Sequence, residues 1–166
     1  MIWRRIVFIL VVLGLQGVLG LLLPLTVSPP DLFLLTALAM TSRLSPLWTI
    51  GVGYGMGLLQ DVLGAGALGF HAAGIMAGVA VAGFVRRGLS SENNVNHTLG
   101  VLIAMITKWL VFILLGYWTR LSAMNLETLL FRFLPELVTT LICGPFLFTF
   151  FNWAFGAQRP NEGRLL

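Results

Sequence analysis

The chain has 166 residues, of which 58% are hydrophobic and 10% are charged, and its formal net charge is +4. Its mean hydropathy is +0.95. Because a soluble domain carries about 25% charged residues, this composition excludes an ordinary soluble domain and predicts a polytopic membrane protein. The basic residues stand singly or in pairs beside apolar runs, which is typical of membrane orientation signals and gives no indication of nucleic-acid binding.

Two spans are predicted in the N-terminal part of the chain. The first covers about residues 6–23. Its apolar run is longer than that of a signal peptide and no small-residue cleavage site follows it, so we expect it to remain uncleaved. A Pro-Pro-Asp turn then predicts that Asp31 is the N-cap of a second span, about residues 31–44. Only residues 32–40 of that span are continuously apolar, which is short for a hydrocarbon core of about 30 Å.

Four more spans follow, at about residues 47–63, 70–85, 97–118 and 135–155. Ser45-Pro46 is a typical helix start for the third span, and Pro135 is one for the last. Between the last two spans, residues 120–133 mix charges with Leu, Met and Phe, which predicts an amphipathic segment at the membrane interface. Residues 1–166 are therefore expected to form a single all-α domain, a membrane bundle of six transmembrane helices.

The arginines predict the orientation of these spans. With six spans and a cytoplasmic N-terminus, seven arginines lie on the cytoplasmic side and two on the outer side: Arg4, Arg5, Arg43, Arg86, Arg87, Arg159 and Arg164, against Arg120 and Arg132. If the second span were re-entrant, the later loops would change sides and the division would be four against five. The positive-inside rule therefore favours six spans with both termini cytoplasmic, in a bacterial inner membrane.

Small residues recur at a spacing of four in the third and fourth spans. They are Gly51, Gly53, Gly55 and Gly57 in the third span, and Gly74 and Gly78 in the fourth. Small residues at this spacing allow the backbones of membrane helices to approach closely. Packing of the two spans against each other and docking of a partner's membrane helix both fit the pattern.

Three ionisable side chains lie at or near membrane depth. Lys108 is near the middle of the fifth span, Asp61 ends the third and Glu136 opens the sixth. Charges inside a membrane require partners, so we expect Lys108 to pair with Asp61 or Glu136 across the bundle. In the alternative reading, Glu136 complements the helix dipole and Asp61 is hydrated at the hairpin.

The sequence contains no pattern for an enzyme or a metal site. It has no nucleophile elbow, no phosphate-binding loop and no zinc-protease motif. Neither His71 nor His97 has a second ligand at metal-binding spacing. We therefore predict no enzymatic activity, no metal and no cofactor.

The glycine-rich third span and the hairpin after it form a longer pattern. A run of glycines beginning at Gly51 ends in Gly-Leu-Leu-Gln-Asp at residues 57–61, and Gly64 and Leu68-Gly69 lead into the next span. This pattern resembles the central signature of the rod shape-determining protein MreD family. The layout of the spans is similar to that family along the whole chain.

The resemblance implies a non-enzymatic membrane scaffold subunit of the bacterial cell-elongation machinery, which makes peptidoglycan in rod-shaped cells. Its implied direct partner is MreC, a single-span periplasmic protein. Through MreC the chain reaches RodA and a class B penicillin-binding protein, and the actin-like MreB lies on the cytoplasmic side. We expect MreC to contact residues 120–133, including Leu126 and Leu130, and a helix face near the third and fourth spans. Membrane lipids surround the bundle.

The MreD family is similar in fold to the substrate-binding subunits of energy-coupling-factor transporters, which also have six helices. A vitamin-binding subunit of this kind is therefore the alternative function. It would need an outward-facing pocket with several polar groups. The candidates on the predicted outer side are Asp61, His71, Arg120, Asn125, Glu127, Arg132 and Glu136. Against this alternative, the first span has three spaced glycines in place of the Ala-x-x-x-Ala docking motif of such subunits.

Overall fold

The computed structural model describes residues 2–22, 28–64, 68–88, 94–120 and 126–156, without the side chains of residues 87–88, 94–95 and 126–129. All regular structure within these ranges is helical, as predicted. The helices are α1 (Ile2–Leu22), α2 (Leu32–Met40), α3 (Pro46–Leu63), α4 (Phe70–Gly88), α5 (Asn94–Trp118) and α6 (Leu126–Phe155).

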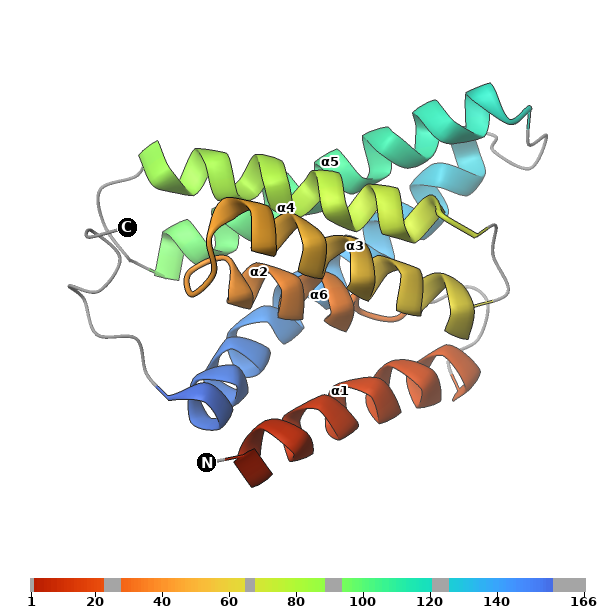
Figure 1. Ribbon diagram of the computed structural model, residues 1–166. Coiled ribbons are helices and arrows are strands. Elements are labelled where there is room, and N and C mark those ends of the chain that lie inside the picture. The colour runs from red at the N-terminus through yellow and green to blue at the C-terminus, as the bar shows by residue number, and fades with distance from the viewer. Residues whose placement is uncertain (1, 23–27, 65–67, 89–93, 121–125, 157–166) are drawn as a thin grey trace.

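Successive helices run in alternating directions, so the start of α1 and the end of α6 lie at the same end of the molecule, on the left in Figure 1. α4 packs between α3 and α5. α1 lies at the edge, where it contacts α6 and, to a smaller extent, α2. We call the end that holds the start of α1 and the end of α6 the terminal end of the bundle.

The short helix α2 forms the centre of the bundle. Every residue from Leu32 to Ala39 is buried, and α2 contacts each of the other five helices. We expected a marginal span over residues 31–44, but the helix covers nine residues, about 14 Å, and is surrounded by protein. A helix that is apolar on all sides is stable when other helices enclose it, which explains why α2 does not need the length of a lipid-exposed span.

In contrast to α2, α1 is mostly exposed. Its buried residues are Phe8, Val12 and Gln16, which recur every four residues and therefore form one narrow face. Phe8 packs against three aromatic rings of α6, with ring centroids 5.1 to 5.7 Å away. The remaining apolar side chains of α1 are largely exposed, as expected for a helix in contact with lipid.

Three helices are long and apolar enough to cross a membrane. Within the described residues they are Ile2–Leu22, Asn96–Trp118 and Leu130–Phe155, and the apolar part of α4, Phe70–Arg86, is shorter. These properties, together with the exposed apolar side chains, are those of a helical membrane protein.

The last helix begins earlier than predicted. α6 starts at Leu126, so Pro135 lies inside it, and residues 126–133 belong to this helix and not to a separate interfacial segment. Residues 126–134 are mostly good helix formers, and membrane helices tolerate an internal proline when its freed carbonyl groups find other partners. α4 and α5 also exceed their predicted ranges by three residues, whereas α3 begins at Pro46 as its sequence indicates.

Candidate functional site

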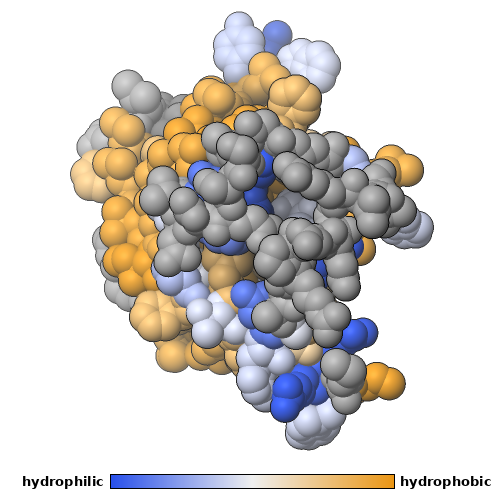
Figure 2. Space-filling model, turned by 90° about the vertical axis from the view of Figure 1, so that its left-hand side faces the viewer, coloured by the Kyte–Doolittle hydropathy of each residue, from blue (hydrophilic) through white to orange (hydrophobic). Residues whose placement is uncertain are grey.

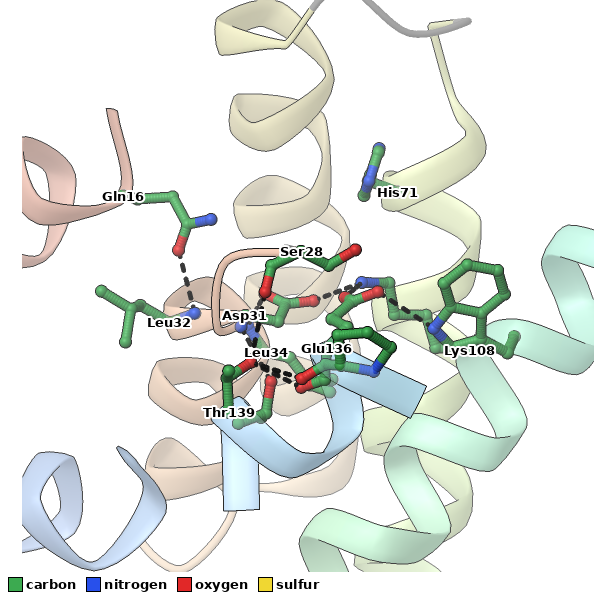
Figure 3. Close-up of polar contacts among 12 residues, drawn as sticks. Gln16, Ser28, Asp31, Leu32, Leu34, His71, Lys108, Glu136 and Thr139 are labelled. Carbon is green, nitrogen blue, oxygen red and sulfur yellow. Dashed lines mark hydrogen bonds and ion pairs between the residues drawn. The ribbon is translucent and has the colours of Figure 1, made fainter. Parts of the chain in front are cut away.

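A buried ionic cluster joins three helices near the middle of the bundle (Figure 3). Lys108 of α5 has no exposed surface. Its Nζ donates to Oδ2 of Asp31 at 2.5 Å and to Oε1 of Glu136 at 2.6 Å. Asp31 precedes α2 and Glu136 lies in α6, so a single ammonium group connects α2, α5 and α6. We call Asp31, Lys108 and Glu136 the ionic cluster.

The second oxygen of each carboxylate also has a donor. Oδ1 of Asp31 accepts the backbone N–H of Leu34 at 2.8 Å, which is the N-cap bond predicted for the second helix. Oε2 of Glu136 accepts the indole N–H of Trp109 at 3.1 Å. Every carboxylate oxygen of the cluster therefore has a hydrogen-bond partner, as burial requires.

Two further side chains attach the start of α2 to its neighbours. The backbone N–H of Asp31 donates to Oγ1 of Thr140 in α6 at 2.9 Å. The N–H of Leu32 donates to Oε1 of Gln16 in α1 at 3.0 Å, as Figure 3 shows. These bonds satisfy backbone groups that the first turn of a helix leaves free, and they connect α1 and α6 to the same point.

The ionic cluster contains two carboxylates and one ammonium, so its formal charge is negative. The N-terminus of α2 points at Asp31 and supplies part of the compensating positive charge. Phe112 lies beside the cluster, with its ring centroid 5.4 Å from the ammonium nitrogen of Lys108. Because its charged groups are bonded to one another and to Leu34 and Trp109, the cluster is suited to holding helices together.

Lys108 pairs with Glu136, one of its two predicted partners. Pairing with Glu136 is confirmed, so the reading of Glu136 as a simple dipole partner is wrong, and Glu136 lies well inside α6. Pairing with Asp61 does not occur. Asp31 is the partner that sequence reasoning missed, because its N-cap pattern predicted a turn residue and not a buried charge.

Asp61 instead caps α4. Its carboxylate accepts the backbone N–H groups of Gly69, His71 and Ala72 at 2.8, 3.0 and 3.1 Å. The ring nitrogen Nδ1 of His71 lies 2.8 Å from Oδ1 of Asp61. Only 3% of Asp61 is exposed, so the prediction that it is hydrated at the hairpin is wrong. Gly69 has φ +97°, a conformation that glycine adopts without strain, and this directs its N–H to the carboxylate.

The glycines divide between two helix interfaces. A Cβ on Gly57 would lie 2.4 Å from Cα of Ala72, and one on Gly53 would lie 3.3 Å from Cα of Met76, so these two allow α3 to approach α4. The predicted packing of these spans is confirmed there. A Cβ on Gly78 would lie 2.6 Å from the carbonyl oxygen of Ala104 in α5.

Gly74 belongs to the same α4–α5 interface, because its Cβ would lie 2.6 Å from the ring of Phe112 and 3.0 Å from Cγ of Lys108. The fourth-span glycines therefore face α5 and not α3. Gly51 and Gly55 are exposed, with no atom within 4 Å of a Cβ at either position. Gly64 ends α3 and is exposed.

The predicted partner-binding leucines lie at the start of α6. The side chain of Leu130 is 48% exposed, and the side chain of Leu126 lies outside the described residues. No group of three side chains suited to hold a metal ion occurs in the part of the chain that the structure describes.

Comparison with known proteins leaves the family open. No protein-family model, curated protein or solved structure matches this chain. The function proposed below is therefore based on the residues of this chain and their contacts.

Proposed function

We propose that this chain is a non-enzymatic membrane scaffold subunit of the bacterial cell-elongation machinery, of the MreD type, and that it binds MreC. Through MreC it helps to organise RodA and a class B penicillin-binding protein, with MreB on the cytoplasmic side. The proposal is supported by the resemblance of residues 51–69 and by one observation: Gly53, Gly57, Asp61 and Gly69 of this signature join α3 to α4.

The signature residues act together in the hairpin. Gly57 allows the backbone of α3 to contact Ala72, and four residues later Asp61 accepts three N–H groups at the start of α4. The result is a firmly connected pair of helices. The opposite side of α3, with Gly51, Gly55 and the half-exposed Tyr54, faces outward. A scaffold requires this combination of a rigid unit and an open helix face that a partner's helix can approach closely.

The proposed setting is a bacterial inner membrane crossed six times, with both termini cytoplasmic. The alternating helix directions support it (Figure 1). The arginines whose side chains are described support it as well. Arg4 and Arg5 lie at the start of α1, Arg43 lies in the turn after α2 and Arg86 lies near the end of α4, all at the terminal end of the bundle. Arg120 and Arg132 are exposed near the opposite end. By the positive-inside rule, the terminal end is cytoplasmic.

We further propose that MreC contacts the start of α6. Leu130 and Phe131 are 48% and 71% exposed there. A photo-crosslinking residue at position 126 or 130 should capture MreC in cells. A matched probe at Ile142, which is also exposed on α6, should not. Failure of both probes to capture MreC, with a working positive control, would rule out this contact.

Co-purification tests the scaffold itself. The detergent-solubilised chain should recover MreC and carry no bound vitamin, whereas a bound vitamin without MreC would indicate a transporter subunit. Gly55→Leu adds a side chain to the outward face of α3, where no atom lies within 4 Å of its Cβ. This variant should remain folded and lose MreC if that face is the docking surface. Gly14→Leu is the control, because Gly14 also has open space around it but lies on α1.

The described residues offer no support for a vitamin pocket on the outer side. Asp61 and Glu136, two of its candidate lining residues, are bonded within the fold. Arg120 and Arg132 are exposed, and the side chains of Asn125 and Glu127 lie outside the described residues.

A further inference from the structure

α6 contains a proline between two parts that are attached to the bundle in different ways. Pro135 lies inside this helix, about a third of the way from its start. A proline has no N–H, so the carbonyl of Phe131 loses its usual helical donor, and the proline ring crowds that carbonyl. Sharp bends in helices occur mostly at such positions. We call residues 126–134, the part of α6 before Pro135, the arm.

The part of α6 that follows Pro135 is fixed to the bundle. Glu136, the next residue, accepts from Nζ of Lys108 at 2.6 Å and from the indole N–H of Trp109 at 3.1 Å. These two donors are consecutive residues of α5. Further along α6, four apolar side chains belong to the buried core or pack against it: Leu137, Leu141, Leu147 and Phe151.

The far end of α6 is fixed as well. Phe155 lies there, and its carbonyl oxygen accepts from NH1 of Arg43 at 3.0 Å. The ring of Phe155 also packs against Phe8 of α1, with centroids 5.7 Å apart. Figure 2 looks onto this terminal end of the bundle and shows hydrophilic residues beside a hydrophobic flank. From Glu136 onward, α6 is therefore held at both of its ends.

The arm makes less contact with the bundle. Leu130, Phe131 and Leu134 are 48%, 71% and 51% exposed. Among the apolar side chains described between residues 130 and 134, Phe133 is the one that packs against the core. Its ring lies across that of Trp109, with centroids 5.6 Å apart and an interplanar angle of 67°.

Trp109 therefore contacts α6 on both sides of the proline. Its N–H donates to Glu136 after Pro135, and its ring packs against Phe133 before it. Only 8% of Trp109 is exposed, and its ring is supported from within α5 by Phe112, with centroids 5.6 Å apart. A buried side chain held in this way can bridge a weak point in the neighbouring helix.

We propose that Pro135 is a hinge and that Trp109 is the clamp that holds the arm against α5. The arm has nine residues and is about 14 Å long, so a change of about 20° in the bend would move its tip by about 5 Å. A molecule that binds the arm more tightly at one angle would favour that angle.

The hinge itself rests on the fold alone. Leu130 and Phe131 of the arm are the exposed side chains assigned above to the contact with MreC. The angle of the arm would set the direction in which they point, and this consequence alone rests on the proposed function. Because the experiment below uses the chain without MreC, its failure and the failure of the proposed function can be distinguished.

The test measures the position of the arm by pulsed electron–electron double resonance. The purified full chain, in a Cys143→Ala background, carries nitroxide labels at positions 62 and 126. Position 62 is an exposed site on α3, and position 126 is the tip of the arm. Trp109→Phe removes the N–H and Phe133→Ala removes the ring contact. Each variant should broaden the 62–126 distance distribution by about 5 Å, the movement worked out above.

Three controls separate a hinge from general loosening. Labels at positions 62 and 142 report on α6 beyond the proline, at another exposed site, and their distribution should not change. Phe131→Ala removes an exposed ring of the same arm and should have no effect. Pro135→Ala restores the missing N–H, so adding it to Phe133→Ala should make the 62–126 distribution narrow again.

Phe133→Ala keeps the test available if Trp109→Phe does not fold, because Phe133 is only partly buried. An unchanged 62–126 distribution in Phe133→Ala would overturn the clamp, and so would equal broadening in Phe131→Ala. Equal broadening of the 62–142 distribution, or a broad 62–126 distribution that persists after Pro135→Ala is added, would overturn the hinge.

Discussion

Replacing Lys108 by methionine tests the ionic cluster most directly. Methionine has a similar length and removes the ammonium, which leaves Asp31 and Glu136 buried with one oxygen each lacking its donor. Removing one partner of a buried ion pair costs about 3–5 kcal/mol. Because the same ammonium serves both carboxylates, the two losses are coupled and should not be added. We therefore expect Lys108→Met to have a free energy of unfolding about 3–5 kcal/mol lower than that of the wild-type chain.

A rescue experiment separates the effect of the unpaired buried charges from the effect of lost packing. Adding Asp31→Asn and Glu136→Gln to Lys108→Met removes both unpaired charges. Asparagine is a good N-cap, and a glutamine oxygen can still accept the indole N–H of Trp109. The triple variant should therefore recover most of the stability that Lys108→Met loses.

The unfolding temperature in detergent, followed by the loss of the monodisperse size-exclusion peak, measures this effect. With about 2–4 °C for each kcal/mol in a chain of this size, Lys108→Met should unfold roughly 6–20 °C below the wild-type chain. Equal unfolding temperatures for Lys108→Met and the wild type would refute the ionic cluster as a stabilising element. A triple variant no more stable than Lys108→Met would show that unpaired charge is not the cause.

Three other predictions use the same unfolding assay. Gly57→Ala should lower the free energy of unfolding by about 1–3 kcal/mol, because its Cβ would overlap the backbone of α4. Gly55→Ala is the control and should change the stability little, because there is open space around its Cβ. Equal effects of the two variants would refute the α3–α4 interface. Asp61→Ala should lower the free energy of unfolding by about 2 kcal/mol, because three N–H groups at the N-terminus of α4 lose their acceptor. An unchanged unfolding temperature would contradict the role of Asp61 as a cap. Trp109→Phe should lower the free energy of unfolding by about 1–3 kcal/mol because Oε2 of Glu136 loses its donor, and an unchanged unfolding temperature would contradict that bond.

The parts of the fold that follow from local chemistry could be predicted. Ser45-Pro46 marks the start of α3, and Asp31 caps α2 as its turn pattern indicates. The close contact of Gly53 and Gly57 with α4 could be predicted because such a contact in lipid requires small residues, although the same spacing also included the exposed Gly51 and Gly55. These signals depend on residues within one or two helical turns of each other, so they can be recognised in the sequence alone.

The position of α2 could not be predicted in the same way. Hydropathy measures the preference for apolar surroundings, and lipid chains and the interior of a helix bundle are both apolar. From hydropathy, a nine-residue apolar helix is therefore predicted to be a short membrane span, although the other helices enclose it. This also hid Asp31, whose charge is buried only because α2 is central. Similarly, the spacing of Gly74 and Gly78 predicts close contact but does not distinguish α3 from α5, because α4 lies between them.

The ionic cluster connects α5 and α6 near the middle of the bundle. α5 and α6 are joined at Lys108 and Glu136, and Trp109 packs against Phe133 with ring centroids 5.6 Å apart. Toward the terminal end the two helices diverge (Figure 1). The ionic cluster and the Trp109–Phe133 contact therefore join α5 to α6 away from the end where the two helices diverge.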